Sequence, residues 1–259
     1  MLRASRKFLL WSILSLLPAV LNGTEVRNPA EFPSVARVMS WNERGGSLGS
    51  ATCVFSSDMT GNSYLLTATH VIEGAIHRPR VTFPDGSSYF AEIVYSPKGS
   101  DVTVLRIAGK REHWTPISDE LPDTGDEVMF AGYGATSTQN WNRDHFLGYT
   151  GPVIGRYYSA RTDVQNRISC WTPKISQGDS GGAVFWRGKH VGVISARIVA
   201  LGHGIFCETK TLGIDMTWIR KLDLQGRPVL EEKEAKKQAP AKKKTPSQRP
   251  RSQWGRWRR

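Results

Sequence analysis

The chain has 259 residues, enough for one large or two small globular domains, and a formal net charge of +12. The charge lies at the two ends: residues 231–259 carry 11 Lys and Arg against 3 Asp and Glu, and Arg3, Arg6 and Lys7 add three more positive charges. Residues 8–230 therefore have a net charge of only +1, which excludes a folded body that binds polyanions through its overall charge.

The N-terminus has the pattern of a secretory signal peptide. A basic start, "MLRASRK", precedes the 13-residue apolar run "FLLWSILSLLPAV". A membrane-spanning helix needs about 20 apolar residues, whereas a signal peptide needs about 7–15. We therefore expect residues 1–19 to be a signal peptide and the rest to be secreted or periplasmic, with no membrane span after signal removal. Ala19 suits cleavage before Val20, and cleavage after Gly23 is the alternative.

Short apolar runs between turn residues follow, and they predict strands. The runs are residues 34–41, 50–56, 63–72, 80–84, 89–96, 101–107, 126–134, 182–186 and 190–200. Hairpin turns are expected at "PDG" (84–86) and near Gly188. One helix, "MTWIRKL", follows the N-cap candidate Asp215. Many short strands and one late helix predict an all-β fold of closed or double β architecture.

The three cysteines, Cys53, Cys170 and Cys207, do not have the spacing of a zinc site. An odd number leaves at least one thiol unpaired within the chain. Cys53 lies in an apolar run and is expected to be a small core residue. A disulfide between Cys170 and Cys207 is possible in an exported protein, and free thiols are the equal alternative. No metal or cofactor is expected.

Residues 231–259 have almost no core-forming residues before Trp254 and are predicted to be disordered. Residues 235–259 contain 10 Lys and Arg and no acid. Such a run binds anionic surfaces or nucleic acid with strong salt dependence. Trp254 and Trp257, set among arginines, suit a membrane interface or stacking on bases. The alternative is a solvated tail that only aids solubility.

The stretch "GDSGG" at 178–182 is either a polar turn or a nucleophile loop. A serine nucleophile needs a base, and His70 directly follows the apolar run "LLTAT", although a lone histidine at a strand end is more often structural. An acid must orient the base. Asp101 precedes an apolar strand, where a carboxylate is costly unless paired. Asp85 is the competing acid, but its place in "PDG" already explains it as a turn residue.

The segments "TATH", "DVTVL" and "GDSGG", in this order, resemble the trypsin-like (chymotrypsin-fold) serine proteases, in the manner of bacterial members. "GYG" at 132–134, "GVIS" at 192–195 and the late helix support the resemblance, which covers about residues 20–225. It implies two packed six-stranded β-barrels, at 20–120 and 121–230, the second with the C-terminal helix. It also implies a secreted serine endopeptidase that cleaves polypeptides through an acyl-enzyme.

The resemblance implies a role for each motif residue. Ser180 is the expected nucleophile, His70 the base and then acid, and Asp101 the carboxylate that orients His70. The N–H groups of Gly178 and Ser180 form the expected oxyanion hole. Ser195 is expected to hydrogen-bond near Asp101 and to offer backbone to an extended substrate. Two alternatives remain: a catalytically inactive binding module on this fold, and a polyanion-binding protein that acts through its tail.

The expected substrate pocket contains two cations. Lys174, six residues before the nucleophile, occupies the position that commonly forms the pocket base, and Arg197 lies near the pocket wall. Together they would favour an acidic side chain before the cleaved bond. Both side chains pointing to solvent is the commoner outcome.

Asp179 precedes the expected nucleophile and would be buried beside the active site. In one branch of the family, a new N-terminal amine pairs with the acid at this position. We expect the α-amine of Val20, released by signal-peptide removal, to be this partner. Cleavage after Gly23, with Asp179 satisfied by backbone N–H groups, is the competing view.

Overall fold

The computed structural model describes residues 24–43, 45–134, 146–157, 167–171, 174–198 and 202–225. The expected signal peptide, Val20 and the basic tail lie outside the described residues. No helix in these described ranges has the length and apolar character needed to cross a membrane.

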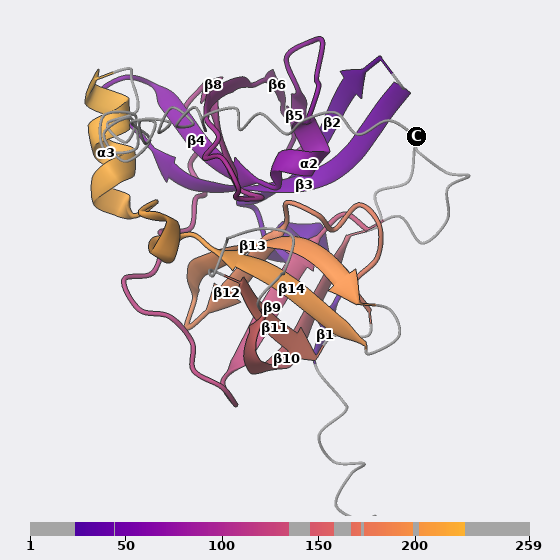
Figure 1. The fold of residues 1–259 in the computed structure, drawn as a ribbon. Helices are drawn as coiled ribbons and strands as arrows, with labels where there is room; N and C mark the ends of the chain where they lie inside the picture. The colour runs from indigo at the N-terminus through magenta and orange to yellow at the C-terminus, as the bar shows by residue number, and fades with distance from the viewer. Residues whose placement is uncertain are drawn as a thin grey trace, which may run out of the picture. The chain divides into compact units, whose positions relative to one another are not determined.

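The N-terminal sheet has seven antiparallel strands in the order β6-β5-β2-β3-β4-β8-β7, and it curls into a half-barrel (Figure 1). Its strands are β2 (Val35–Asn42), β3 (Gly45–Ser56), β4 (Asn62–Thr67), β5 (Arg80–Thr82), β6 (Ser88–Phe90), β7 (Glu92–Tyr95) and β8 (Thr103–Ala108). The predicted strand at 63–72 ends at Thr67, where a single helical turn, α2 (Thr69–Ile72), begins.

The C-terminal sheet is a closed six-stranded barrel, because β9 pairs with both β12 and β10. Its strands are β9 (Glu127–Gly132), β10 (Leu147–Tyr157), β11 (Arg167–Trp171), β12 (Ala183–Trp186), β13 (Lys189–Ile198) and β14 (His203–Glu208), with β1 (Glu25–Val26) added to β10. The all-β prediction is confirmed. Only one of the two sheets closes, however, and no apolar run predicted β10, β11 or β14.

The two halves exchange their ends. The N-terminal strand β1 joins the C-terminal barrel, whereas the helix α3 (Met216–Gln225) lies beside β4 and β8 (Figure 1). Trp218 of α3 packs against Tyr95, with ring centroids 5.0 Å apart and the ring planes tilted by 54°. Asp223 accepts a hydrogen bond of 3.0 Å from the hydroxyl of Tyr64. Asp215 caps the helix as predicted, since its Oδ1 accepts from the Trp218 N–H at 2.7 Å.

Both predicted hairpin turns are confirmed. Asp85 Oδ1 accepts from the Ser87 N–H at 2.9 Å in the turn between β5 and β6. Hydrogen bonds from Ser87 and Arg111 lower the pKa of Asp85 to about 2. The turn between β12 and β13 has positive φ at Arg187 and Gly188, of 50° and 73°, as a tight two-residue hairpin requires.

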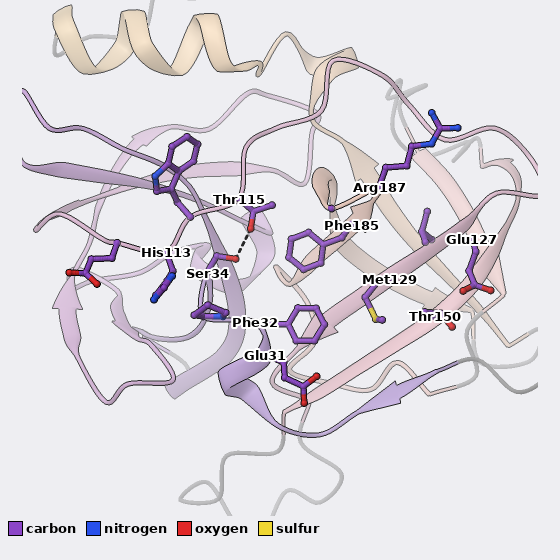
Figure 2. A pocket seen from close by; sticks show the side chains of 15 residues that line it. Glu31, Phe32, Ser34, His113, Thr115, Glu127, Met129, Thr150, Phe185 and Arg187 are labelled. Atoms are coloured by element: carbon purple, nitrogen blue, oxygen red, sulfur yellow. Dashed lines mark hydrogen bonds between the residues drawn. The ribbon is translucent and has the colours of Figure 1, made fainter.

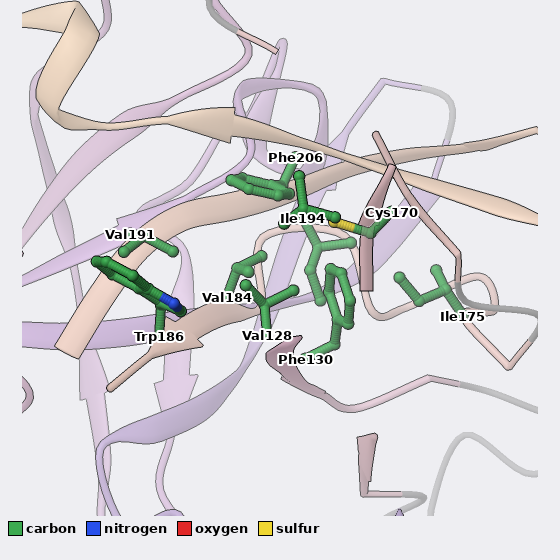
Figure 3. Close-up of a cluster of buried hydrophobic side chains, with 10 residues drawn as sticks. Val128, Phe130, Cys170, Ile175, Val184, Trp186, Val191, Ile194 and Phe206 are labelled. Carbon is green, nitrogen blue, oxygen red and sulfur yellow. The ribbon is translucent and has the colours of Figure 1, made fainter. Parts of the chain in front are cut away.

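The core of the barrel is formed by alternate residues of its strands, which face inward (Figure 3). Phe130 of β9 and Phe206 of β14 meet edge to face, with ring centroids 6.4 Å apart. Val184 and Ile194 pack in the same cluster, and Cys170 contributes its side chain as a small apolar group. This core fixes β12, which residues 176–182 directly precede, and β13, whose Ile194 exchanges backbone hydrogen bonds with Gly181 and Gly182.

The suggested disulfide between Cys170 and Cys207 is not present. Cys170 pairs across the ladder with Gly204, and Cys207 lies three residues further along β14. That offset corresponds to about 10 Å, beyond the reach of a disulfide. All three cysteines of the chain are among the described residues, and each side chain is a buried thiol. Burial raises the pKa of Cys53 to about 12, and the expectation that Cys53 is a core residue is confirmed.

His190 is a fully buried histidine at the start of β13. Its backbone holds the segment that links the two sheets: its N–H donates to Pro116 O at 2.9 Å, and its carbonyl accepts from Ser118 N at 2.8 Å. The ring faces Phe185, and neither ring nitrogen has a hydrogen-bond partner. Burial without such a partner lowers the pKa of His190 to about 3.

This histidine predicts acid sensitivity of the fold. Unfolded histidine has a pKa of about 6.5, so the unfolded state binds the proton first, and stability falls as pH drops from about 6.5 toward 3. We expect His190→Leu to flatten the fall in the free energy of unfolding between pH 6.5 and 4.5, measured by urea denaturation. His113→Gln, at an exposed histidine, should leave the slope unchanged. Equal slopes for His190→Leu and the unmodified protein would contradict this assignment.

Candidate active site

His70 and Asp101 lie side by side at the ends of neighbouring strands of the N-terminal sheet. His70 is on α2, directly after β4, and Asp101 precedes β8. The Nδ1 atom of His70 is 2.8 Å from Oδ2 of Asp101, and the backbone N–H of His70 donates to Oδ1 at 3.0 Å. These two contacts fix the ring against the carboxylate and leave Nε2 directed away from it.

The carboxylate of Asp101 is held ionised by its partners. Burial raises the pKa of Asp101, but hydrogen bonds from His70 and Ser195 outweigh this effect and hold the pKa below its usual value. Ser195 of β13 donates its hydroxyl to Oδ2 at 2.5 Å. The contact that sequence analysis expected from Ser195 is thus made, and it brings the C-terminal barrel to the acid of the other sheet.

Ser180 lies in the loop at residues 176–182, here called the glycine loop. Gly178 and Gly181 have φ of 101° and 86°, which only glycine adopts without strain. The backbone N–H groups of Gly178 and Ser180 donate to no other described residue, and the Ser180 hydroxyl likewise has no partner among them. The loop therefore presents two unengaged donors beside a serine hydroxyl, although that hydroxyl is not hydrogen-bonded to His70.

The glycine loop packs directly on the strand that leads to His70. A Cβ atom at Gly181 would lie 2.1 Å from Ser50 O and 3.0 Å from Ala68 N. Ser50 of β3 donates its N–H to Ser180 O at 2.8 Å and its hydroxyl to Gly178 O at 2.9 Å. Ser50 belongs to none of the motifs from which the site is predicted. Its run of small residues, Gly-Ser-Ala at 49–51, signals a strand that another backbone approaches closely.

Asp179 is buried at 3% exposure beside Gly132 and Gly134. Its Oδ2 accepts from the Ser176 N–H at 2.8 Å, whereas Oδ1 has no hydrogen-bond partner. Burial outweighs the hydrogen bonds from Ser176 and Gly134 and raises the pKa of Asp179 to about 6. The backbone thus satisfies only half of this carboxylate.

The two cations expected in the substrate pocket do not converge. The ammonium of Lys174 forms an ion pair with Glu25 of β1 and lies 5.2 Å from the centre of the Tyr149 ring. Arg197 instead donates from Nη1 to the carbonyl of Ile175 at 2.7 Å, beside the glycine loop. The structure therefore pairs Lys174 with the N-terminal strand β1, whereas Arg197 is held by the backbone beside the glycine loop.

A separate cavity of about 510 Å³ is lined by residues 31–34 before β2, by residues 112–115 of the segment that links the sheets, and by the C-terminal barrel; it contains none of the expected site residues (Figure 2). Phe32 and Phe185 stack in it, with ring centroids 5.8 Å apart, and the Ser34 and Thr115 hydroxyls are hydrogen-bonded at 2.8 Å. β9 and β12 run from this cavity, at Glu127 and Phe185, to the neighbourhood of the glycine loop. The cavity is thus at the strand ends opposite Ser180. In the described part of the chain, no three His, Cys, Asp or Glu side chains gather as a metal site would require.

Comparison with known proteins gives the family. The sequence model of the trypsin-like peptidase domain matches residues 49–193, a span that includes His70, Asp101 and Ser180. The chain therefore belongs to the trypsin-like peptidase domain family, whose members are serine proteases of the chymotrypsin fold. A search of curated proteins gives no match.

Three solved structures with a similar fold are those of proteases. A serine endoprotease from Yersinia pestis is 26% identical, with a TM-score of 0.56 over 75% of this chain and 64% of that chain. The HtrA-type protease AlgW, solved with a tripeptide, is 25% identical, with a TM-score of 0.60 over 77% of this chain and 64% of that one. A protease from M. tuberculosis in its active form, 19% identical with a TM-score of 0.58 over 73% and 83%, shares the fold. The chain spans less than two thirds of the first two proteins.

The close packing at Gly181 predicts that even a small side chain at this position destabilises the fold. Gly181→Ala adds a methyl group that overlaps Ser50 O and forces alanine to a φ of 86°. Gly188→Ala, in the open β12–β13 turn, imposes similar strain at φ 73° with no atom within 4 Å. We expect Gly181→Ala to cost about 1–3 kcal/mol more unfolding free energy than Gly188→Ala, because only Gly181 is overpacked. Equal losses in chemical denaturation would show that the loop is not tightly packed.

Proposed function

We propose that this chain is a secreted or periplasmic serine endopeptidase that hydrolyses peptide bonds of polypeptides with His70, Asp101 and Ser180. Its two proposed halves are residues 20–120 and 121–230, which exchange β1 and the helix α3. The observation that carries the proposal is the meeting of three sequence motifs from both halves. The carboxylate of Asp101 orients His70 at 2.8 Å, and the glycine loop packs on the backbone just before His70.

The proposed reaction begins with attack of Ser180 Oγ on the scissile carbonyl carbon, while Nε2 of His70 takes the hydroxyl proton. Asp101 stabilises the imidazolium and holds the proton on Nδ1. His70 then gives the proton to the leaving amine, the C–N bond breaks, and an acyl-enzyme remains. A water molecule, deprotonated by His70, attacks this ester; the bond between Ser180 Oγ and the acyl carbon breaks, His70 returns the proton to Ser180, and the acid product leaves. The lowered pKa of Asp101 supports this role, because it keeps the carboxylate ionised.

The unengaged N–H groups of Gly178 and Ser180 are the proposed oxyanion hole. They stabilise the negative oxygen of the tetrahedral intermediate, and losing one such donor typically costs about 10²–10³ in rate. We propose that the β13 backbone beyond Ser195 binds the substrate in extended form and that Arg197 lines the pocket for the side chain before the cleaved bond. Hydrolysis of peptides that differ only at that residue, by Arg197→Ala and the unmodified protein, would test this lining.

Substitution of the triad tests the proposed activity. Ser180→Ala and His70→Ala should abolish hydrolysis of a casein or peptide-library substrate while keeping the fold, because neither side chain fills the core. Asp101→Asn should lower kcat by roughly 10⁴, since the amide stabilises the wrong tautomer of His70. Asp85→Asn, at the turn carboxylate, is the matched control and should retain full activity. Activity in Ser180→Ala equal to that of the unmodified protein would contradict the proposal.

We also propose that the α-amine of Val20, exposed by removal of residues 1–19, pairs with Asp179. The free Oδ1 of Asp179 supports the need for a further donor. The described chain starts nearby: the Thr24 N–H donates to the Thr150 hydroxyl at 2.8 Å, and Lys174, the partner of Glu25, lines a small cavity together with Asp179. Residues 20–24 can span up to about 14 Å.

The proposed ion pair between the α-amine of Val20 and Asp179 predicts the direction in which activity changes with pH. Pairing raises the pKa of the amine above its usual value of about 7.7–8.0, so its stabilising effect is complete below that value and is lost as pH rises through the raised pKa. Activity should therefore fall at alkaline pH, and N-acetylation should reproduce the fall. Asp179→Asn should lose activity as well, because removing one partner of a buried pair costs about 3–5 kcal/mol. N-terminal sequencing that finds a fully active protein starting at Thr24 would exclude Val20.

We propose that the basic tail, residues 231–259, tethers the protease to an anionic surface. The body has a net charge of only +1, so salt-sensitive binding to polyanions should depend on the tail. A protein truncated after Leu230 should keep full activity on a small peptide and should lose binding to heparin or anionic vesicles. Binding that survives the truncation would contradict the tether.

A further inference from the structure

Ser50 of β3 is a fully buried serine between the two halves, and every polar group it has is hydrogen-bonded. Its N–H donates to Ser180 O at 2.8 Å, and its hydroxyl donates to Gly178 O at 2.9 Å. The hydroxyl oxygen accepts from the Tyr133 N–H at 2.8 Å, and the carbonyl accepts from the Thr67 hydroxyl at 2.7 Å. One residue thus holds the carbonyls of the same two residues whose N–H groups are unengaged.

These contacts fix three consecutive peptide planes of the glycine loop. The Gly178–Asp179 peptide is held by the Ser50 hydroxyl at its carbonyl and by Ser176 O at its N–H, at 3.2 Å. The Asp179–Ser180 peptide is held by the Gly182 N–H at its carbonyl, at 2.8 Å. Because a trans peptide points its N–H opposite to its carbonyl, that contact turns the Ser180 N–H outward.

The third fixed peptide plane follows Ser180. The Ser180–Gly181 peptide is held by the Ser50 N–H at its carbonyl and by Ile194 O at its N–H, each at 2.8 Å. Ser50 therefore holds the planes on either side of the Ser180 N–H. Any residue at position 50 offers the backbone N–H, but only a side-chain donor of this length offers the bond to Gly178 O.

We propose that Ser50 is a positioning residue, whose hydroxyl, by holding the Gly178 carbonyl, orients the next unengaged N–H along the loop, that of Ser180, toward the oxyanion. This inference rests on the proposed function. It differs from a purely structural role, in which the hydroxyl would only satisfy two buried backbone groups, Gly178 O and Tyr133 N. A positioning role affects the transition state more than the bound substrate, because the oxyanion exists only after attack has begun.

The chain offers a matched control in Ser63 of β4. Ser63 is also fully buried, and its hydroxyl donates to Gly109 O at 2.7 Å and accepts from the Arg111 N–H at 3.0 Å. Ser50→Ala and Ser63→Ala therefore remove the same group from equally buried sites of one sheet. Thermal unfolding should show comparable losses of stability for the two variants.

The kinetic test compares the two variants on one peptide substrate. We expect Ser50→Ala to lower kcat by about 10- to 100-fold, less than the 10²–10³ for removal of a donor, with KM within twofold. A peptide boronate, which places an anionic oxygen in the hole, should bind more weakly by a similar factor. Ser63→Ala should leave both quantities unchanged. An unchanged kcat in Ser50→Ala, or an equal loss in Ser63→Ala, would overturn the inference.

A second measurement does not depend on proteolysis. Hydrogen–deuterium exchange of residues 176–182 should be faster in Ser50→Ala than in the unmodified protein and in Ser63→Ala, because the loop loses one of its fixed planes. Faster exchange together with absent proteolysis in the unmodified protein would support the positioning contact and contradict the proposed function. Unchanged exchange would contradict the positioning role, whatever the protein cleaves.

Discussion

The site depends on one contact between two backbones, that of the glycine loop with β3 of the other sheet. His70 and Asp101 come from the N-terminal sheet and Ser180 from the C-terminal barrel. Their alignment therefore depends on the contact between the two halves. Ser50 forms this contact through two hydrogen bonds to the glycine loop. Gly181 lets the backbone of the glycine loop approach the backbone of β3 so closely that a single methyl group would force the two segments apart. The glycines of "GDSGG" are thus required by packing as much as by the turn.

The exchange of the two chain ends, β1 and α3, also holds the two halves together. β1 joins the barrel, and α3 returns to the N-terminal sheet through Trp218 and Asp223, so the halves cannot separate without breaking both contacts. The interior in turn contains polar groups that a purely structural core would avoid. Asp179 has an oxygen with no partner, and His190 has two such nitrogens. For Asp179, its place directly before Ser180 connects this cost to the proposed function, whereas His190 serves the link between the sheets.

Local chemistry made much of the fold predictable. Asp215 as a cap, the turns at Asp85 and Gly188, and most strands of the N-terminal sheet follow from short-range preferences that the tertiary structure keeps. Strands β10, β11 and β14 were missed because glycine and polar residues interrupt their apolar pattern. The residues of the proposed site are predicted from motif order, and the contact of Asp101 with His70 agrees with that prediction. Ser50 and the Glu25–Lys174 pair are not predicted from the sequence, because each depends on contacts between residues more than 100 positions apart.

The proposed function requires His70 to activate Ser180 as a nucleophile. The most direct measurement is intact-protein mass spectrometry after treatment with a fluorophosphonate, followed by peptide mapping of the adduct. We expect one adduct per chain, located on Ser180, and its loss in His70→Ala, which keeps the serine but lacks the base. No adduct on the folded, unmodified protein, or equal labelling of His70→Ala, would contradict activation by His70 and favour a binding module on the protease fold.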